Sequence, residues 1–387
     1  MKRKTGRYEH TTVAGEEVAA FVPEPLPPSE PPLDLDDELL ARLEDARQEL
    51  SHLELAGEMV PSIEWFIYAF VRKEAVLSSQ IEGTQATLVN LLEFEAETNK
   101  RTMDADVEEV CNYLDALQFA RDQLSHSDGL PISRRLLNET HQRLMQGVRG
   151  ANKRPGEVRT SQNWIGGTRP GNAQYVPPPP HLLGQALSDF EHYIHADDDL
   201  APLLRVGLLH VQFESLHPYL DGNGRIGRLL IALLLQQWGL LSKPLLYLSL
   251  FLKQHRQEYY RLLDAVRTEG DWEGWLLFFL EGVAQVAREA VSTSRALFEL
   301  VSEDRQKVLS LDSATMMSIR LFELLPEHPV VTATNAIELL DTSRPTAGKA
   351  ISVLEEAGVL IEVTGRQRDR IFHYQSYLDR LGEGTEL

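Results

Sequence analysis

The stretch His217-Pro-Tyr-Leu-Asp221-Gly-Asn-Gly-Arg225-Ile-Gly-Arg228 is followed at once by the apolar run Leu229–Leu235. The run predicts a buried helix, and Gly222-Asn223-Gly224 predicts a tight turn at its N-terminus. Backbone N–H groups at such a turn, together with the positive end of the helix dipole, suit phosphate groups. The forked guanidiniums of Arg225 and Arg228 suit phosphate oxygens as well. The stretch therefore predicts an anion site at the start of a helix.

Two further side chains of this stretch fit phosphate chemistry. Asp221 is a hard oxygen ligand of the kind that holds Mg²⁺ beside phosphates. His217, with an ordinary imidazole pKa of about 6.5, is largely neutral at pH 7 and can accept a proton. The structural alternative is a helix end, a glycine turn and two solvated arginines. The chain has no Gly-x-x-x-x-Gly-Lys-(Ser/Thr) segment, which argues against a P-loop hydrolase.

The stretch resembles the signature of the Fic family, His-x-Phe-x-(Asp/Glu)-Gly-Asn-Gly-Arg-x-x-Arg, with Tyr219 in place of Phe. The resemblance implies transfer of AMP from ATP to a Ser, Thr or Tyr hydroxyl of an unknown target protein, with self-modification included. It makes His217 the general base and Asp221 the Mg²⁺ ligand. The ATP-binding positions that it implies in this stretch are Asp221, Gly222, Asn223, Gly224, Arg225, Ile226, Gly227 and Arg228, the last at the γ-phosphate.

A second segment, Ser78-Ser-Gln-Ile-Glu82-Gly83, predicts the end of a helix. Gly83 suits a left-handed C-cap, whereas Glu82 lies at the negative helix end and prefers a positive partner or solvent. A solvated surface glutamate is the structural alternative. The segment resembles the (Ser/Thr)-x-x-x-Glu-(Gly/Asn) inhibitory motif of Fic proteins. The resemblance implies that Ser78, Glu82 and Gly83 form a brake, in which Glu82 enters the ATP site and competes with the γ-phosphate for Arg228.

A third segment lies between these two. Gly and Pro punctuation across residues 154–180 predicts a short β-hairpin whose exposed edge could pair with an extended peptide. An ordinary surface hairpin is the alternative. The segment resembles the flap that clamps the target chain in Fic enzymes, with Ile165 as the apolar contact.

After the signature, residues 246–251 and 257–263 resemble the Fic core that walls the adenine. His255 falls where related sequences commonly carry Asn; we include it among the ATP-binding candidates, and nucleotide preference stays open. For Tyr259 and Tyr260, core packing and a nucleotide contact are equally favoured. We expect His210 to satisfy a local hydrogen bond rather than bind a cation.

Composition limits the function classes. A length of 387 residues suggests two or three domains. A net charge of −20 argues against broad, nonspecific binding to nucleic acid or anionic membranes. The single cysteine, Cys111, excludes an intramolecular disulfide. Neither a signal core nor a run of about 18 apolar residues occurs, so we expect a cytoplasmic protein without a membrane partner.

Helical periodicity dominates the chain and predicts a mainly α fold: a Fic-type helical domain with a short β-hairpin flap, plus a C-terminal winged helix-turn-helix domain. We expect an irregular, Pro-rich arm at 1–34, a helical region with the inhibitory motif at 35–125, a catalytic core at 126–300 and the winged-helix-like domain at 311–380. The expected helices are Leu35–Leu53, Ser62–Glu82, Ala86–Thr98, Asp104–Ser125, Ser133–Met145, Pro180–Ala196, Leu200–Ser215, Arg225–Trp238, Leu250–Glu269, Asp271–Ser310, Thr315–Leu325, Thr334–Leu340 and Thr346–Ala357.

The last region leaves alternatives open. Two helices followed by a basic hairpin have the order of a winged helix, which can bind DNA. The charges of acidic residues nearly cancel those of its basic residues, so dimerisation or intramolecular docking is as favoured as DNA binding.

An autoinhibited adenylyltransferase is the leading function, with ATP and Mg²⁺ implied. The alternatives are a DNA-binding regulator, or a Fic enzyme that removes AMP or transfers another phosphate-containing group. In the C-terminal region, the five basic residues that could contact DNA phosphates are Arg344, Lys349, Arg366, Arg368 and Arg370.

Overall fold

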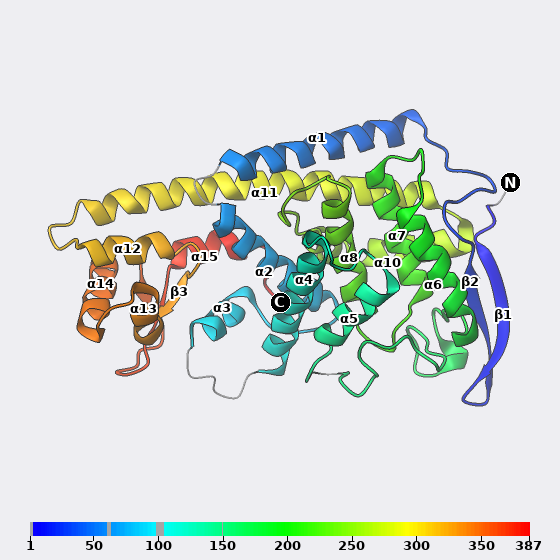
Figure 1. Cartoon of the computed structure of the whole chain (residues 1–387), viewed down its shortest axis with the longest axis horizontal. Coiled ribbons are helices and arrows are strands. Elements are labelled where there is room, and N and C mark those ends of the chain that lie inside the picture. Colours follow the sequence, from blue (N-terminus) through cyan, green and yellow to red (C-terminus); the bar gives the residue numbers. More distant parts are fainter. Residues whose placement is uncertain (1–2, 60–62, 98–103, 149) are drawn as a thin grey trace. The chain divides into compact units, whose positions relative to one another are not determined.

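The structure, a computed structural model, describes residues 3–59, 63–97, 104–148 and 150–387. It is mainly helical, as predicted, and also contains two small antiparallel sheets (Figure 1). The strands are β1 (Gly6–Val13), β2 (Glu16–Pro23), β3 (Val330–Thr332), β4 (Ile361–Glu362) and β5 (Ile371–His373). The helices are α1 (Asp37–Met59), α2 (Ile63–Ile81), α3 (Leu88–Ala96), α4 (Ala105–Ser125), α5 (Arg134–Leu144), α6 (Pro180–His195), α7 (Pro202–Leu216), α8 (Asn223–Gln237), α9 (Ser249–Gln254), α10 (Arg256–Glu269), α11 (Trp272–Leu309), α12 (Met316–Leu324), α13 (Ala333–Leu340), α14 (Arg344–Glu356) and α15 (Gln375–Gly382).

The chain forms two compact units, and each is assembled from separate stretches of sequence. Unit 1 comprises residues 1–51, 112–243 and 251–286. Unit 2 comprises residues 52–111, 244–250 and 287–387. The chain passes from one unit to the other within α1, α4, α9 and α11 and in the loop between α8 and α9. Within the described part of the chain, none of the helices has the length and apolar character needed to cross a bilayer.

The expectation of an irregular arm at 1–34 is wrong, because β1 and β2 form an antiparallel hairpin. Ala14 and Gly15 both have positive φ, 49° and 85°, as a two-residue hairpin turn requires. Val18 and Ala20 of β2 pack against Val176 of the flap region, residues 154–180. The hairpin is thus part of unit 1.

The chain around this hairpin is fastened to α11. The guanidinium of Arg3 donates two hydrogen bonds of 2.8 Å to the carboxylate of Glu273. It also donates to the carbonyl oxygens of Pro31 and Pro32, at 2.8 and 2.7 Å. One buried cation therefore joins both ends of the N-terminal segment to the first turn of α11.

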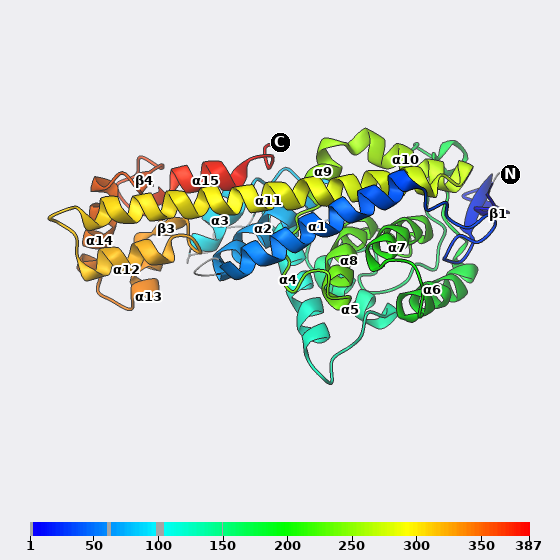
Figure 2. The same ribbon diagram turned by 90° about the horizontal axis from the view of Figure 1, so that it is seen from above.

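The core of unit 1 is built around α7 and α8, which lie side by side (Figure 2). Every residue from Leu203 to Leu216 is buried, so α7 is enclosed on all sides. Gly227 of α8 sits where an added Cβ would lie 2.4 Å from a carboxylate oxygen of Glu214. A glycine at this position lets the two helices approach closely, which fixes the loop between them.

Most helix predictions agree with the structure to within a few residues, but Leu250–Glu269 is wrong as a single helix. His255, with φ −109° and ψ 33°, ends α9 and is the N-cap of α10. Buried apolar residues occur on both sides of this break, so the apolar pattern by itself does not reveal it. Ser62 and Thr98, two expected helix ends, lie outside the described residues.

The C-terminal part of unit 2 runs in the order α12, β3, α13, α14, β4, β5, α15. The sheet order is β3-β5-β4, with Val331 opposite Phe372 and Ile361 opposite His373. Thr315 and Thr332 cap α12 and α13 with capping boxes. The predicted hairpin is present as a shorter ladder, whereas β3 and α15 were not predicted.

Candidate active site

The candidate site begins where α7 ends. His217 is the C-cap of α7 and has left-handed backbone angles, φ 45° and ψ 60°. Its N–H donates to the carbonyl oxygen of Phe213 at 2.9 Å. A non-glycine residue in this conformation costs about 1–2 kcal/mol, so the surrounding structure must hold the turn.

Arg159, which the sequence analysis did not single out, supplies that support. Its side chain is 2% exposed, and burial lowers its pKa to about 10. Its guanidinium donates to the carbonyl oxygens of His217 at 2.9 Å and Pro178 at 2.6 Å. Its own N–H donates to the carbonyl oxygen of Pro218 at 2.9 Å. One buried cation therefore joins the His217 turn to the end of the flap region.

Asn223 closes the loop from the other side. Its side-chain oxygen accepts from the N–H of Tyr219 at 2.8 Å, and its amide donates to the carbonyl of the same residue at 2.8 Å. The Tyr219 hydroxyl donates to the side-chain oxygen of Asn138 at 2.9 Å, and burial raises the pKa of this phenol. The asparagine of the glycine turn thus has a structural task, which leaves its backbone N–H as the group available to a ligand.

A second residue that sequence reasoning missed is His141 of α5. Its ring stacks on Tyr219 with centroids 3.8 Å apart and planes 5° from parallel. Its Nδ1 accepts from the N–H of Gly156 at 2.9 Å, and its Nε2 lies 3.0 Å from the carbonyl oxygen of Asp221. An N–H can only donate, so the ring proton is on Nε2. Burial, with a smaller contribution from the charge of Arg225, lowers the pKa of His141 to about 4, and the ring is neutral.

The first turn of α8 has the features of an anion site. Gly222 is its N-cap in the left-handed conformation, with φ 76°, and a glycine has no side chain with which to cap this end. The first N–H groups of any helix lack intrahelical acceptors and carry the positive end of the dipole. Arg225 and Arg228 are 2% and 3% exposed, so both cations are held inside the protein. Ile226 and Gly227 are buried on the same turn.

Asp221 lies at the edge of this turn and meets the requirements of a Mg²⁺ ligand. Its side chain is 41% exposed, and one oxygen accepts from the N–H of Gly222 at 2.7 Å. That oxygen is 4.0 Å from a guanidinium nitrogen of Arg225. Among the described residues, no group of three or more His, Cys, Asp or Glu side chains could hold a metal. A single carboxylate fits a cation that takes its other ligands from phosphates and water.

The flap region is held against the last turn of α7, which precedes His217. Ile165 and Tyr175 form one antiparallel bridge, with N–H to O distances of 2.8 and 3.1 Å. The expected hairpin is therefore only a single bridge, because Pro170–Asn172 forms a 3-10 turn and Pro177–Pro180 cannot donate. The Tyr175 hydroxyl donates to the carbonyl oxygen of Ser215 at 2.6 Å, and burial raises its pKa to about 12.

The β1–β2 hairpin supports the flap region from its other side. The N–H of Phe21 donates to the carbonyl oxygen of Val176 at 2.8 Å. The carboxylate of Glu16 accepts from the N–H of Gly171 at 2.7 Å and pairs with Arg169 at 2.9 Å. Ile165, half-buried, is thus carried on a segment tied to both α7 and β2.

The remaining sequence candidates in unit 1 lie elsewhere. His210 is 1% exposed; its Nδ1 lies 3.2 Å from the carbonyl oxygen of Gly227 and its Nε2 lies 2.8 Å from the Tyr259 hydroxyl. The expected local hydrogen bond of His210 is therefore confirmed, and Tyr259 is a core residue. His255 is exposed and packs its ring on Phe251, with centroids 4.2 Å apart. Its assignment to the ATP site stays a prediction.

The candidate inhibitory residues belong to unit 2. As predicted, the helix ends beside Glu82: α2 stops at Ile81, and Gly83 has φ 98°. Ser78 is buried and Glu82 is exposed. Glu82 and Arg228 belong to different units, and their pairing stays a prediction.

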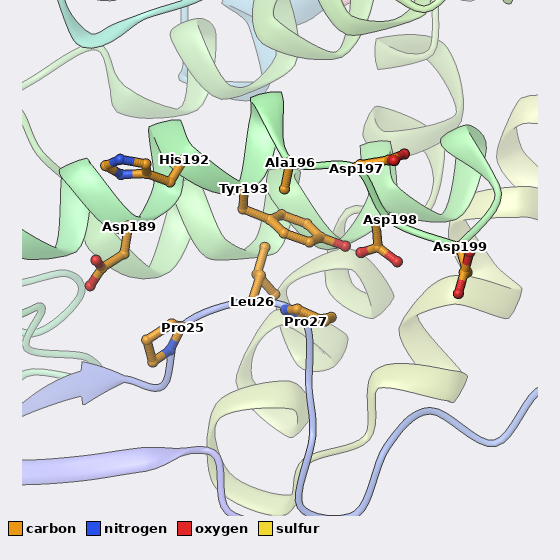
Figure 3. Close-up of a pocket in the computed structure, with 10 residues that line it drawn as sticks. All are labelled: Pro25, Leu26, Pro27, Asp189, His192, Tyr193, Ala196, Asp197, Asp198 and Asp199. Carbon is orange, nitrogen blue, oxygen red and sulfur yellow. The ribbon is translucent and has the colours of Figure 1, made fainter.

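A cavity of about 640 Å³ opens at the end of α6, and none of the candidate site residues lines it (Figure 3). Its lining includes four aspartates, and Figure 3 shows the Tyr193 ring with its hydroxyl toward Asp198. Burial raises the pKa of Tyr193, and the Asp198 carboxylate adds to the shift. We interpret the cavity as separate from the chemistry of the signature stretch, because none of that stretch lines it.

Comparisons with known proteins agree with the site. Residues 40–122 match the family described as Fic/DOC family N-terminal, and residues 131–235 match the Fic/DOC family. The protein adenylyltransferase Fic of Drosophila grimshawi is 28% identical over 262 residues, which is 64% of this chain and 48% of that protein. The protein of the same name from Culex quinquefasciatus is 28% identical over 258 residues, 64% and 46% of the two chains. The chain thus matches about half the length of these relatives.

Solved structures share the fold. A Fic family protein from Desulfovibrio desulfuricans superposes with a TM-score of 0.57 at 18% identity, covering 89% of this chain and 97% of that one. A fragment of Fic-1 from C. elegans gives 0.50 at 22% identity, with 69% and 73% covered. With both domain matches and the signature on one helix–loop–helix, the chain carries the N-terminal and Fic domains of the Fic/DOC family.

Proposed function

We propose that the chain is a protein adenylyltransferase that moves AMP from ATP to a hydroxyl of a target protein. The observation that carries the proposal is the start of α8, where the N-cap is a left-handed glycine and two buried arginines follow. This anion site begins directly after His217 and Asp221 in the chain. The curated relatives named protein adenylyltransferase support the same assignment.

In this proposal, the target hydroxyl oxygen attacks the α-phosphorus of ATP in line with the leaving pyrophosphate. A new oxygen–phosphorus bond forms, the bond to pyrophosphate breaks, and the hydroxyl proton passes to His217. The first N–H groups of α8 and Arg225 hold the phosphates, and Arg228 holds the γ-phosphate. Mg²⁺ bound at Asp221 would neutralise charge on the leaving phosphates.

The target would bind as an extended chain beside Ile165, because a strand edge recognises main chain with little demand on sequence. Such binding would present a Ser, Thr or Tyr hydroxyl to His217. The anchoring of the flap region to α7 through Tyr175 supports this, since it fixes the edge relative to the base.

The test is transfer of label from α-³²P-ATP to proteins of the native cell and to the chain itself. His217→Ala should abolish transfer and leave ATP affinity largely unchanged, because the base acts on the nucleophile and not on the phosphates. His192→Ala, at an exposed histidine of α6, is the matched control. Full transfer by His217→Ala would overturn the assignment. Release of AMP from a modified protein, measured in parallel, tests the reverse reaction.

We further propose that Glu82 inhibits the enzyme by pairing with Arg228. Charge-assisted pairing to an arginine is worth about 1.5–3 kcal/mol, or roughly ten- to a hundredfold in ATP affinity. Glu82→Gly should therefore raise self-adenylylation by about that factor at low ATP, with Glu44→Gln, an exposed glutamate of α1, as control. Equal rates for wild type and Glu82→Gly across all ATP concentrations would reject the brake.

A second candidate function is DNA binding by residues 311–380 as a winged helix. The order α12, β3, α13, α14, β4, β5 supports it, since α14 would be the recognition helix and the β4–β5 turn the wing. All five basic residues singled out from the sequence are exposed. A mobility shift with random duplex DNA tests it: Arg344→Ala should weaken binding and reduce its salt dependence. No shift at low salt would favour docking to protein.

A further inference from the structure

The helix that carries the inhibitory motif is fastened to the last part of the chain. Unit 2 contains both residues 52–111 and residues 287–387. Within it, α15 packs against α2 and α3, the helices on either side of Glu82. Tyr377, Leu378 and Leu381 form the buried face of α15.

The most specific of these contacts is made by Gln80, two residues before Glu82. Its side-chain amide donates to the carbonyl oxygen of Thr385 at 2.8 Å and to that of Ala86 at 3.0 Å. Both amide protons are therefore used. One bonds Ala86, at the far end of the loop that carries Glu82, and the other bonds Thr385. The side chain joins the end of α2 to a segment more than three hundred positions along the chain.

The acceptor at Thr385 is itself held in place. Thr385 is 4% exposed, and its N–H donates to the carbonyl oxygen of Gly382 at 2.9 Å. Its hydroxyl donates to the same oxygen at 2.7 Å. This turn closes on the last residue of α15, so the position of α15 determines the position of the carbonyl that Gln80 binds.

A buried charge lies on the same side of α2, seven residues before Gln80. Lys73 is 3% exposed, and burial lowers its pKa to about 8. The carboxylates of Glu289, Glu383 and Glu386 oppose this shift, so two of the three acidic groups near the ammonium belong to the segment around Thr385. Positions seven apart share a helix face, and α2 presents both residues to the same segment.

The other side of the inhibitory loop is also attached to this region. Glu93 of α3 lies 3.0 Å from Nε2 of His373 in β5. The hydroxyl of Thr332 in β3 donates to the carbonyl oxygen of Ala96 at 3.4 Å. Both helices that border Glu82 therefore depend on the C-terminal sheet and α15 for their position.

We propose that the segment Gly382–Glu386 is a latch on the inhibitory helix, and that its contact with Gln80 sets how strongly Glu82 inhibits. A partner that binds residues 311–380 and displaces α15 would loosen the latch and raise adenylylation. This inference rests on the proposed function, because it names the regulation of that same site.

Gln80→Met tests the latch, since methionine keeps the size and helix propensity of glutamine but has no donor. Loss of two neutral hydrogen bonds should raise self-adenylylation at low ATP by about five- to 150-fold. The increase should not exceed that of Glu82→Gly, and the double variant should match Glu82→Gly. Gln118→Met, an exposed glutamine of α4, is the matched control.

A second measurement does not depend on activity. Amide hydrogen exchange of residues 78–86 should be faster in Gln80→Met than in wild type, with α7 and α8 unchanged. If Glu82→Gly raises the rate but Gln80→Met does not, the latch is rejected and the brake stands. If neither variant raises it, the brake is rejected and the latch, as its regulator, is rejected with it. An additive double variant would also overturn the latch.

Discussion

Replacing His141 should weaken ATP binding even though this side chain lies outside the signature stretch. The imidazole accepts the N–H of Gly156 and donates to the carbonyl oxygen of Asp221, and its ring stacks on Tyr219. His141→Phe keeps a flat ring for the stack and removes both hydrogen bonds. The turn that precedes α8 would then lose the contact that orients Asp221.

The size of the effect follows from the two lost bonds. Each is worth about 0.5–1.5 kcal/mol, and a buried group left without a partner costs about 1–3 kcal/mol. We expect His141→Phe to lower the free energy of unfolding by about 2–4 kcal/mol, which a protein of ordinary stability of about 5–15 kcal/mol survives. If half of this free energy, about 1–2 kcal/mol, is lost from the ATP-bound turn, the affinity for Mg²⁺-ATP falls by about five- to thirtyfold.

Two amide variants separate stability from positioning. His141→Gln can place an N–H where Nε2 donates to Asp221, whereas His141→Asn can place an oxygen where Nδ1 accepts from Gly156. Calorimetric titration with Mg²⁺-ATP should therefore rank Gln above Asn, and urea unfolding measures what each variant loses in stability. Equal ATP affinities for these two variants, or wild-type affinity in His141→Phe, would refute the reasoning.

Three further outcomes are expected. Arg159→Met should lower the rate of AMP transfer to the target by more than about a hundredfold. Arg159→Lys should restore little of that rate, because an ammonium lacks the two-pronged geometry that reaches the carbonyls of both His217 and Pro178. Full rescue by lysine in single-turnover assays would contradict this. Burial holds the pKa of His210 at about 3, below its unfolded value of about 6.5, so the unfolded state binds more protons and the free energy of unfolding falls as pH drops below about 6.5. His210→Gln should make the free energy of unfolding less dependent on pH below about 6.5, by up to about 1.4 kcal/mol per pH unit. If urea unfolding finds the same decrease between pH 7 and pH 5 in the variant and in the wild type, this role of His210 is contradicted. Asp221→Asn should bind ATP equally with and without Mg²⁺, and calorimetry that finds the wild-type Mg²⁺ effect would reject Asp221 as the ligand.

The turn and helix of the signature could be predicted because their determinants are local. The glycine turn, the apolar run and the arginines all lie within residues 217–235, and helical periodicity reports burial directly. The end of α2 beside Gly83 could be predicted for the same reason, since a left-handed cap favours glycine.

The supports of the site could not be predicted, because they act across the chain and mostly through backbone atoms. Arg159 and His141 bind carbonyl oxygens, which every residue has, so no pairing of residue types marks their contacts. The β1–β2 hairpin did carry a signal, namely β-branched and aromatic residues on both sides of Ala14-Gly15, but the prolines that follow it favoured an extended arm. The break at His255 is a tertiary effect that periodicity does not report.

The interleaving of the two units sets an order on synthesis. Residues 52–111 leave the ribosome early, yet their partners in unit 2 include residues 287–387. At about 5–20 residues per second, α2 and α3 wait on the order of 15–60 s for the chain that holds them. During that interval residues 112–243, with the whole signature stretch, are already made. A nascent chain would therefore assemble the Gly222-Asn223-Gly224 turn before the proposed latch on α2 exists.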